Sequence, residues 1–206
     1  MPRDGRATRE RILAAAQRLV IDNGYAATSV DQVIAASGSS KGAFFHHFES
    51  KRALADALVD GYVASDIAHL EAGLSAAREQ SQDPVERAVA FVRYFEDRAD
   101  ELMQEQSGCL YTSILAEREL VTAGASDPIA KAVVAWREGY AELLSEAFHG
   151  RPDVDLEALS DHVFVTFEGA FLLARSTGQP AHMRAQLRIL RQLLTGLLAT
   201  GPRATA

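Results

Sequence analysis

The chain has 206 residues and a mass of 22.3 kDa, a length that suits one large domain or two small ones. Hydrophobic residues make up 48% of the chain and charged residues 24%, which is the composition of a protein with a buried core and excludes a disordered tail. Cys109 is the only cysteine, so an intrachain disulfide is excluded and the composition fits a reducing cytoplasm.

The sequence does not predict a secretion signal or a membrane span. Charged residues, among them Arg11 and Arg18, interrupt the apolar positions near the start of the chain, unlike a signal peptide. The longest apolar run, residues 163–174, contains Glu168 and is much shorter than a membrane-crossing helix. We therefore expect a cytoplasmic protein without a membrane partner.

The net charge of −7 is unevenly distributed along the chain. Residues 1–52 carry a formal charge of +3, and residues 53–206 carry −10. A small basic end on an acidic body is typical of a protein whose N-terminal part alone meets a polyanion. Ordinary scatter explains an excess of three charges equally well.

The N-terminal residues show the spacing of three short helices. Apolar residues recur at helical spacing from residue 12 to residue 20, and Asn23-Gly24 ends this first helix with glycine as a left-handed cap. A second short helix is capped by Thr28 or Ser29 and ends at Gly38. Two short helices joined by a glycine-containing turn, behind a helix that can brace them, predict a helix-turn-helix.

The third predicted helix begins at Ser39 or Ser40 and runs to Phe48. Phe44 and Phe48 are four residues apart, so they share the inner face. The opposite face would meet a DNA groove and carries Lys41, Gly42, Phe45 and His46. Glycine costs about 1 kcal/mol of helix propensity relative to alanine, which indicates that the backbone needs room at this position.

Helical spacing continues through the rest of the chain. A long helix begins after Ser50, another begins at Asp83-Pro84, and further apolar segments lie at 109–120, 129–144 and 159–171. The last helix has apolar residues spaced 4, 3, 4 and 3, which are Met183, Leu187, Leu190, Leu194 and Leu197. There is no β-type alternation and no repeat of 20–50 residues. The sequence thus predicts an all-α protein with about nine helices.

The N-terminal block closely resembles the DNA-binding domain of the tetracycline-repressor (TetR) family. The resemblance is carried by Thr28-Ser29-Val30, by Ala35-Ala36-Ser37-Gly38-Ser39-Ser40-Lys41-Gly42-Ala43-Phe44-Phe45-His46-His47-Phe48 and by Ser50-Lys51-Arg52-Ala53-Leu54. Arg11-Ile12-Leu13-Ala14-Ala15-Ala16 and Gly24-Tyr25 resemble the family's first helix and its exit. Together these segments cover roughly the first quarter of the chain.

The resemblance implies a ligand-responsive, dimeric transcriptional regulator, most often a repressor, that binds a palindromic DNA operator and is released by a small effector. Residues 1–52 would form the helix-turn-helix domain, with a connecting helix to about residue 65. Residues 53–206 would form the domain that binds the effector and joins the homodimer.

The resemblance also implies a set of DNA contacts. They are Thr28, Ser29, Ser39, Ser40, Lys41, Gly42, Phe45, His46 and Lys51. Of these, Ser40, Lys41 and His46 are the candidates for reading bases, and Lys51 for binding phosphate. Phe45 stands where the family usually has tyrosine, and Ala43 where it often has threonine, so one polar contact is lost at each position.

Bulky aromatic side chains are concentrated in the acidic body, which favours an apolar effector pocket with a few polar groups. The candidate lining is Phe91, Phe95, Tyr111, Trp136, Tyr140, Phe164, Phe167, Glu168 and Phe171. These residues would equally suit an ordinary core. The leucine seam of the last helix predicts a dimer interface through Phe164, Leu187, Leu190, Leu194 and Leu197, with packing inside the subunit as the alternative.

No catalytic motif is present, so neither an enzyme nor a cofactor is expected. The run Gly38 to Gly42 lacks the spacing of a phosphate-binding loop, and His46 and His47 point about 100° apart on a helix, which disfavours a metal site. Cys109 is either a small buried hydrophobe or a redox sensor. The acidic body also counts against a protein that coats DNA without sequence preference.

Overall fold

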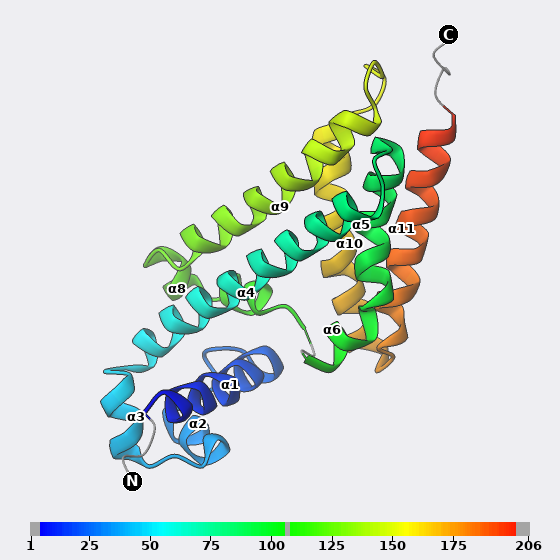
Figure 1. Cartoon of the computed structure of the whole chain (residues 1–206). Helices are drawn as coiled ribbons and strands as arrows, with labels where there is room; N and C mark the ends of the chain where they lie inside the picture. The colour runs from blue at the N-terminus through cyan, green and yellow to red at the C-terminus, as the bar shows by residue number, and fades with distance from the viewer. Residues whose placement is uncertain (1–4, 106–107, 201–206) are drawn as a thin grey trace. The chain divides into compact units, whose positions relative to one another are not determined.

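The computed structural model describes residues 5–105 and 108–200, in which eleven helices occur and no strand (Figure 1). The all-α fold that the sequence predicts is therefore confirmed for this part of the chain. In order, the helices are α1 Gly5–Asn23, α2 Val30–Ser37, α3 Lys41–His47, α4 Lys51–Gln80, α5 Pro84–Asp97, α6 Ala99–Glu105, α7 Leu110–Leu115, α8 Arg118–Thr122, α9 Ser126–Ala147, α10 Leu156–Thr177 and α11 Ala181–Ala199.

The number of helices exceeds the expected nine because one region is more finely divided. The helix that begins at Pro84 ends at Asp97, and α6 follows as a separate turn. Glu117 adopts an extended conformation and splits the segment after Cys109 into α7 and α8. Position 117 is a glutamate and not a helix-breaking Gly or Pro, so hydrophobic spacing alone predicts one continuous apolar segment over residues 109–120.

The described residues divide into two compact units. The first comprises residues 5–65 and 108–131, and the second comprises 66–105 and 132–200. The sequence leads us to expect a single boundary near residue 52, whereas the first unit also includes residues 108–131, since α7 packs against α1 and α8 packs against α7. The helices α4 and α9 each contribute residues to both units.

The first unit is built around α1. Its inner face buries Ile12, Ala16 and Val20, and α1 packs against α2, α3 and α7. Phe44 of α3 is fully buried in this core, beside Phe48 at 3% exposure. The apolar positions that the sequence places on the inner faces of these helices are thus the buried ones, which orients α2 and α3 on α1.

The second unit contains a cluster of aromatic rings from three helices. Phe91 and Phe95 of α5 contact Trp136 of α9 at ring-centroid distances of 6.1 and 5.3 Å, and Phe91 stacks on Tyr140 at 4.7 Å. Phe167 of α10 meets Phe95 edge-on at 5.4 Å. Such offset and edge-to-face pairs contribute packing beyond the area that they bury.

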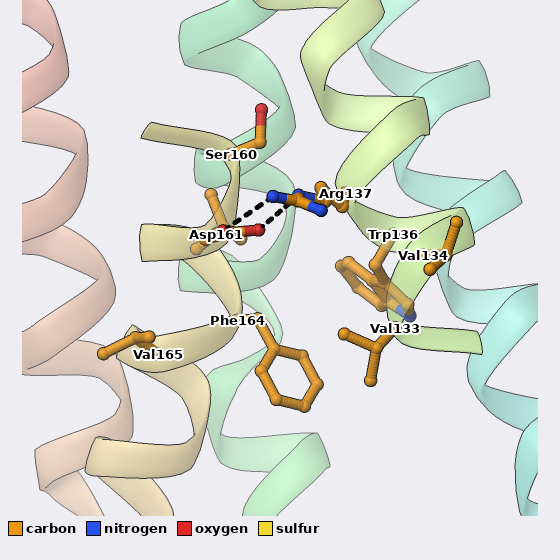
Figure 2. A pocket seen from close by; sticks show the side chains of 9 residues that line it. Val133, Val134, Trp136, Arg137, Ser160, Asp161, Phe164 and Val165 are labelled. Atoms are coloured by element: carbon orange, nitrogen blue, oxygen red, sulfur yellow. Dashed lines mark hydrogen bonds and ion pairs between the residues drawn. The ribbon is translucent and has the colours of Figure 1, made fainter. Parts of the chain in front are cut away.

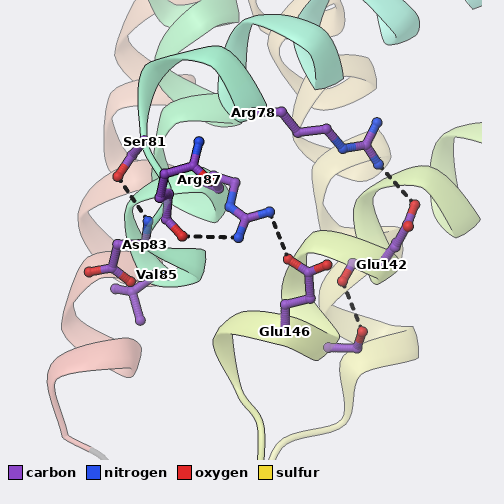
Figure 3. A network of polar contacts seen from close by, with 9 residues as sticks. Arg78, Ser81, Asp83, Val85, Arg87, Glu142 and Glu146 are labelled. Carbon is purple, nitrogen blue, oxygen red and sulfur yellow. Dashed lines mark hydrogen bonds and ion pairs between the residues drawn. The ribbon is translucent and has the colours of Figure 1, made fainter.

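Two ion pairs connect α9 to the helices on either side of the α4–α5 turn (Figure 3). Arg78 of α4 lies 3.0 Å from Glu142, and Arg87 of α5 lies 3.1 Å from Glu146. Both carboxylates are largely exposed, so these pairs add little stability and chiefly fix the register of α9.

α11 is held against α5 by a buried carboxylate. Glu96 is 8% exposed in its side chain, and its oxygens lie 2.6 Å from Arg191 Nε and 3.1 Å from Arg188 Nε. The hydrogen bonds from Arg191 and Arg188 keep the pKa of Glu96 below its ordinary value, against the opposing effect of burial. Glu96 is therefore ionised at neutral pH, and its charge is matched by two guanidinium groups.

Gly73 allows α4 to approach α5 closely. A Cβ atom at Gly73 would lie 2.7 Å from Cε2 of Phe95 and 3.2 Å from Cε2 of Phe91, and both rings are buried. At Gly61 on the same helix, a Cβ atom would meet nothing within 4 Å. The two glycines therefore separate the effect of packing from that of helix propensity.

We expect Gly73→Ala to destabilise the protein by about 1–3 kcal/mol of overpacking, reduced by about 1 kcal/mol of gained helix propensity. Gly61→Ala should be neutral or stabilise by up to about 1 kcal/mol. Urea unfolding followed by circular dichroism measures both. Equal stability of the two variants would show that the Phe95 ring moves aside at no cost.

Candidate nucleic-acid interface and ligand-binding region

The turn between α2 and α3 is fixed by side-chain caps at both helix starts. Ser29 Oγ accepts a hydrogen bond from the Gln32 amide at 3.2 Å, and Gln32 Oε1 accepts one from the Ser29 amide at 2.7 Å. α2 ends at Gly38, whose φ of 62° is left-handed and favours glycine. Ser40 Oγ then accepts from the Ala43 amide at 3.1 Å and begins α3. Of the alternatives that the sequence leaves open, Ser29 and Ser40 are the caps.

α3 presents the expected residues to solvent. Lys41, Gly42, Phe45 and His46 are all exposed, whereas Phe44 and Phe48 face the core. Phe45 is 47% exposed and meets Phe44 edge-on at 5.2 Å, which steadies an apolar ring at the surface. A Cβ atom at Gly42 would meet nothing within 4 Å, so the chain's own packing does not require glycine there.

The adjacent histidines of α3 differ in exposure. His46 is exposed, His47 is half-buried, and their ring centroids lie 5.1 Å apart. In the described part of the chain there is no group of three or more His, Cys, Asp or Glu side chains that could hold a metal ion.

Thr28 has a structural role that differs from the expected DNA contact. It is 2% exposed, and its hydroxyl lies 2.8 Å from the Gly24 carbonyl oxygen and 3.1 Å from that of Leu19. The side chain therefore ties the loop after α1 back onto that helix. A buried hydroxyl that already has acceptors is not available to DNA, so Thr28 leaves the set of candidate contacts.

The remaining serines of the motif also have partners within the chain. Ser39 Oγ lies 2.7 Å from Ser37 Oγ, while Ser29 and Ser40 are exposed and accept the capping bonds described above. A hydroxyl that accepts a bond from a backbone amide still has its own hydrogen to donate. Ser29 and Ser40 therefore remain candidate donors to DNA. Ser37 Oγ donates its own hydrogen to the Ile34 carbonyl oxygen, so Ser39 donates to Ser37, and a DNA contact by Ser39 would have to replace that bond.

Lys51 lies against the loop between α1 and α2. Its Nζ is 4.0 Å from the centroid of the Tyr25 ring and 3.4 Å from the Ala26 carbonyl oxygen. Partial burial lowers the pKa of Lys51, and the nearby carboxylates of Glu117 and Glu119 oppose that shift. A phosphate contact by Lys51 stays a prediction, and Lys51 would have to make it in addition to this bracing role.

Glu117, at the start of α8, also contacts this loop, because its Oε1 accepts a hydrogen bond from the Ala26 amide at 3.0 Å. The end of α8 is bound to α4 instead, since Arg52 Nη2 donates to the Ala123 carbonyl oxygen at 2.9 Å. Burial raises the pKa of Tyr25, and the charge of Glu119 adds to the increase. Sequence reasoning missed this contact because the partners are 91 residues apart and no motif marks them.

The candidate effector residues do not form a single cluster. The rings of Phe91, Phe95, Trp136, Tyr140 and Phe167 pack on one another in the second unit, and Phe171 is also buried there. The Tyr140 hydroxyl donates to the Ala88 carbonyl oxygen at 3.2 Å, and burial strongly raises its pKa. Glu168 is half-buried on α10.

Tyr111 is not grouped with the other aromatic residues. It belongs to the first unit and lies 4.9 Å from the ring of Tyr62, edge-on. Its position follows from the packing of α7 on α1, which hydrophobic spacing does not reveal.

A groove of about 370 Å³ lies between α9 and α10 within the second unit (Figure 2). Two of the predicted pocket residues, Trp136 and Phe164, line it together with Val133, Val134 and Val165. At one end Arg137 Nε lies 2.7 Å from Asp161 Oδ1, and Arg137 also pairs with Glu157. This groove combines apolar walls with a polar end, which is the general composition of ligand sites.

The predicted dimer seam is largely buried inside the subunit. Leu187, Leu190 and Leu194 are 0–4% exposed because α11 packs against α5 and α10 of its own chain. Leu197 and Phe164 are half-buried. The three leucines therefore serve the intrachain packing that the sequence left as the alternative, and they leave no surface for a second chain.

Comparison with known proteins agrees with this architecture. The family model described as "Bacterial regulatory proteins, tetR family" matches residues 12–58, and the model described as "Tetracyclin repressor-like, C-terminal domain" matches residues 84–190. The chain belongs to the TetR family of transcriptional regulators. The second match covers the part of the chain for which the sequence offered only a helical pattern.

Individual relatives extend this result over most of the chain. The chain is 27% identical to the HTH-type transcriptional regulator YxaF of Bacillus subtilis, over 81% of this chain and 84% of that protein. It is 25% identical to the HTH-type transcriptional repressor NemR of Escherichia coli, over 68% and 66%. A TetR transcriptional regulator from Chloroflexus aurantiacus has a solved structure that is 28% identical, with a TM-score of 0.76 over 94% of this chain and 96% of that one.

These relatives are transcriptional regulators and not enzymes, and regulators of this family bind DNA and typically dimerise. None of the helices among the described residues is both long and apolar enough to cross a membrane.

The bracing of the α1–α2 loop can be tested by a single substitution. Glu117→Ala removes the acceptor of the Ala26 amide, so we expect exchange of that amide hydrogen with solvent to rise about two- to tenfold, as a net hydrogen bond of 0.5–1.5 kcal/mol predicts. Glu119→Ala removes a neighbouring carboxylate but no bond to Ala26 and is the matched control. Unchanged exchange at Ala26 in Glu117→Ala would contradict the assigned role.

Proposed function

We propose that the chain is a homodimeric repressor that binds a palindromic operator through α3 and is released by a small, largely apolar effector. The observation that supports this most directly is the exposed face of α3. It carries a cation, a glycine, an aromatic ring and an imidazole, while two buried phenylalanines hold the helix in place. Regulators of this family share the general function, and the dimer, the operator and the effector are the proposed parts.

The chemistry of this face suits sequence recognition. Lys41 at the helix start can donate to guanine edges, and Phe45 can contact the methyl group of thymine. Gly42 leaves the backbone open to close approach, because no side chain of the chain occupies the space beside it. A two-fold dimer would place two such helices about 34–36 Å apart, one turn of the duplex, so that they read successive major grooves.

The charge distribution favours specific over indiscriminate DNA binding. Residues 53–206 carry −10, so only a small part of the surface attracts a phosphate backbone. A protein that coats DNA without sequence preference relies on broad positive surfaces. The acidic remainder therefore supports the interpretation that contact is confined to the N-terminal unit.

The proposed dimer uses a different face of α10 and α11 from the buried leucine seam. Large apolar side chains that remain exposed on these helices are Val165, Leu172, Leu173, Ile189 and Leu193. Val165 and Leu172 share one stripe of α10 with Gly169, and Ile189 and Leu193 share one stripe of α11 with Gly196. At both glycines a Cβ atom would meet nothing within 4 Å. Two such faces suit a four-helix interface between two copies.

Lys41→Ala tests the role of α3. We expect the full chain to select specific sequences from random double-stranded DNA, with an affinity for the selected duplex that falls about 10³–10⁵-fold between 50 and 200 mM salt if 6–10 phosphates are contacted. Lys41→Ala should weaken binding to that duplex and reduce the preference over mismatched duplexes, because it removes a base contact. Fluorescence anisotropy measures both quantities.

Lys131→Ala is the matched control for Lys41→Ala. Lys131 is exposed on α9, and its removal changes the net charge by the same amount. It should leave affinity and preference nearly unchanged. If both lysine variants lose affinity for DNA equally, the net charge of the protein determines DNA binding, and α3 is not the recognition helix.

Leu172→Glu combined with Leu193→Glu tests the proposed interface. Both side chains are more than 60% exposed in the single chain, so their replacement should preserve the fold while placing like charges between the two copies. Sedimentation equilibrium should show a dimer for the natural chain and a monomer for the double variant. The affinity for operator DNA should decrease in the double variant because the dimer is lost. Val85→Glu, at 39% exposure on α5, is the control. A double variant that stays dimeric would place the interface elsewhere.

A further inference from the structure

Phe45 is the one aromatic side chain of the described residues that is exposed. Its exposed fraction is 47%, whereas every other phenylalanine, tyrosine and tryptophan is buried or half-buried. Single apolar side chains at a surface are common, but this ring lies on α3. Its neighbours on the same face, Lys41 and His46, are polar. The ring is therefore an apolar patch within an otherwise polar recognition surface.

The ring of Phe45 is supported by the core below it. It meets the fully buried ring of Phe44 edge-on, with the ring centroids 5.2 Å apart and an angle of 79° between the ring planes. Phe44 in turn packs on Phe48, with 5.8 Å between the ring centroids. A ring with this support loses less conformational freedom on binding than an unsupported side chain does. Phe45 therefore presents preorganised apolar surface to the molecule that meets α3.

Gly42 leaves space next to this ring. Residues three apart on a helix are neighbours on its surface, so Gly42 and Phe45 share one face of α3. A Cβ atom at Gly42 would meet nothing within 4 Å, which means that the Phe45 ring does not fill that space. Because a helical side chain leans toward the preceding turn, the ring borders the gap that the glycine leaves. The edge of a base can thus approach the ring from the side of Gly42.

The chemistry of Phe45 restricts what it can recognise in DNA. A phenylalanine side chain has neither a hydrogen-bond donor nor an acceptor. The base edges in the major groove present donors and acceptors, and the C5-methyl group of thymine is the apolar group among them. Cytosine carries a hydrogen at the same C5 position, and 5-methylcytosine carries the methyl group with the same base pairing. An apolar ring therefore distinguishes pyrimidines by this methyl group and not by the identity of the base.

We propose that Phe45 reads the C5-methyl group of one pyrimidine in each half of the operator, so that methylation of cytosine at that position strengthens binding. The inference deepens the proposed operator binding and rests on it. Lys41 and His46 on the same face read polar edges, and Phe45 adds the methyl group to the recognised pattern. Recognition of the duplex then depends on the chemical modification of a base as well as on the sequence.

Base replacements that change only the methyl group test this inference. Each thymine of the duplex that the full chain selects is replaced in turn by deoxyuridine, which lacks the methyl group, and each cytosine by 5-methylcytosine, which gains it. At one position per half-site, we expect the affinity measured by fluorescence anisotropy to fall about two- to fivefold with deoxyuridine, or to rise by the same factor with 5-methylcytosine, as burial of one methyl group predicts. Replacement in both half-sites should change the affinity by the product of the two factors.

Phe45→Ala identifies the side chain that reads the methyl group. This variant should bind the methylated and unmethylated duplexes with equal affinity at the sensitive position. Comparing both proteins on both duplexes isolates the contact from any effect of the methyl group on DNA shape. Leu115→Ala is the matched control, because Leu115 is 48% exposed on α7 of the same unit, and this variant should retain the full discrimination. Circular dichroism confirms that both variants fold.

Two results would reject the inference alone. The first is a natural chain that selects a duplex but tolerates the loss or gain of the methyl group at every position, and this measurement needs no variant. The second is a methyl effect of the same size in Phe45→Ala, which would assign the contact to another side chain and leave the Phe45 ring to pack on the sugar. A chain that selects no duplex at all would reject the proposed function together with this inference.

Discussion

The burial of Phe44 and Phe48 is the constraint on which the DNA-binding surface depends. The two rings are four residues apart and almost fully buried, so α3 cannot rotate without exposing one of them to water. With that rotation fixed, Lys41, Phe45 and His46 have to point outward. The caps at Ser29 and Ser40 and the left-handed glycine at 38 then fix where the helix begins. The recognition face is therefore a consequence of packing in the core behind it.

The sequence predicted those helices whose boundaries are set by residues close to them in the chain, and it missed those that depend on distant contacts. The positions of α1, α2 and α3 followed from hydrophobic spacing and turn residues, because each helix meets its neighbour within a few residues. The division of residues 110–122 into α7 and α8 did not, since Glu117 is held in an extended conformation with its carboxylate bonded to Ala26 far along the chain. Thr28 was misassigned for a related reason: whether a hydroxyl faces solvent or a backbone carbonyl is decided by the fold of the loop.

In α11 the apolar spacing was recognised from the sequence, but the surface that its leucines pack against was assigned to a second copy and not to the same chain. Its sequence holds two apolar stripes, one through Leu187, Leu190 and Leu194 and one through Ile189 and Leu193. Spacing identified the first stripe but could not say whether it faces its own subunit or a second copy. Glu96 settles the matter in the folded chain, because it binds Arg188 and Arg191 on the flank of α11 and turns the first stripe inward. The second stripe is left at the surface, where the proposed dimer would bury it.

Most of the candidate effector residues of the second unit pack on one another, and Tyr111 of the first unit does not belong to that cluster. Most of the rings pack against one another, and the Tyr140 hydroxyl donates a hydrogen bond to the Ala88 carbonyl oxygen inside the core. Trp136 is the exception, since its ring joins the cluster while its N–H lacks an acceptor and its edge lines the groove. Trp136 and Arg137 stand on α9, which follows α8 in the chain, and Glu117 at the start of α8 binds the Ala26 amide of the α1–α2 loop. α9 contributes residues to both compact units, so the proposed ligand response would involve a helix that the DNA-binding unit also uses.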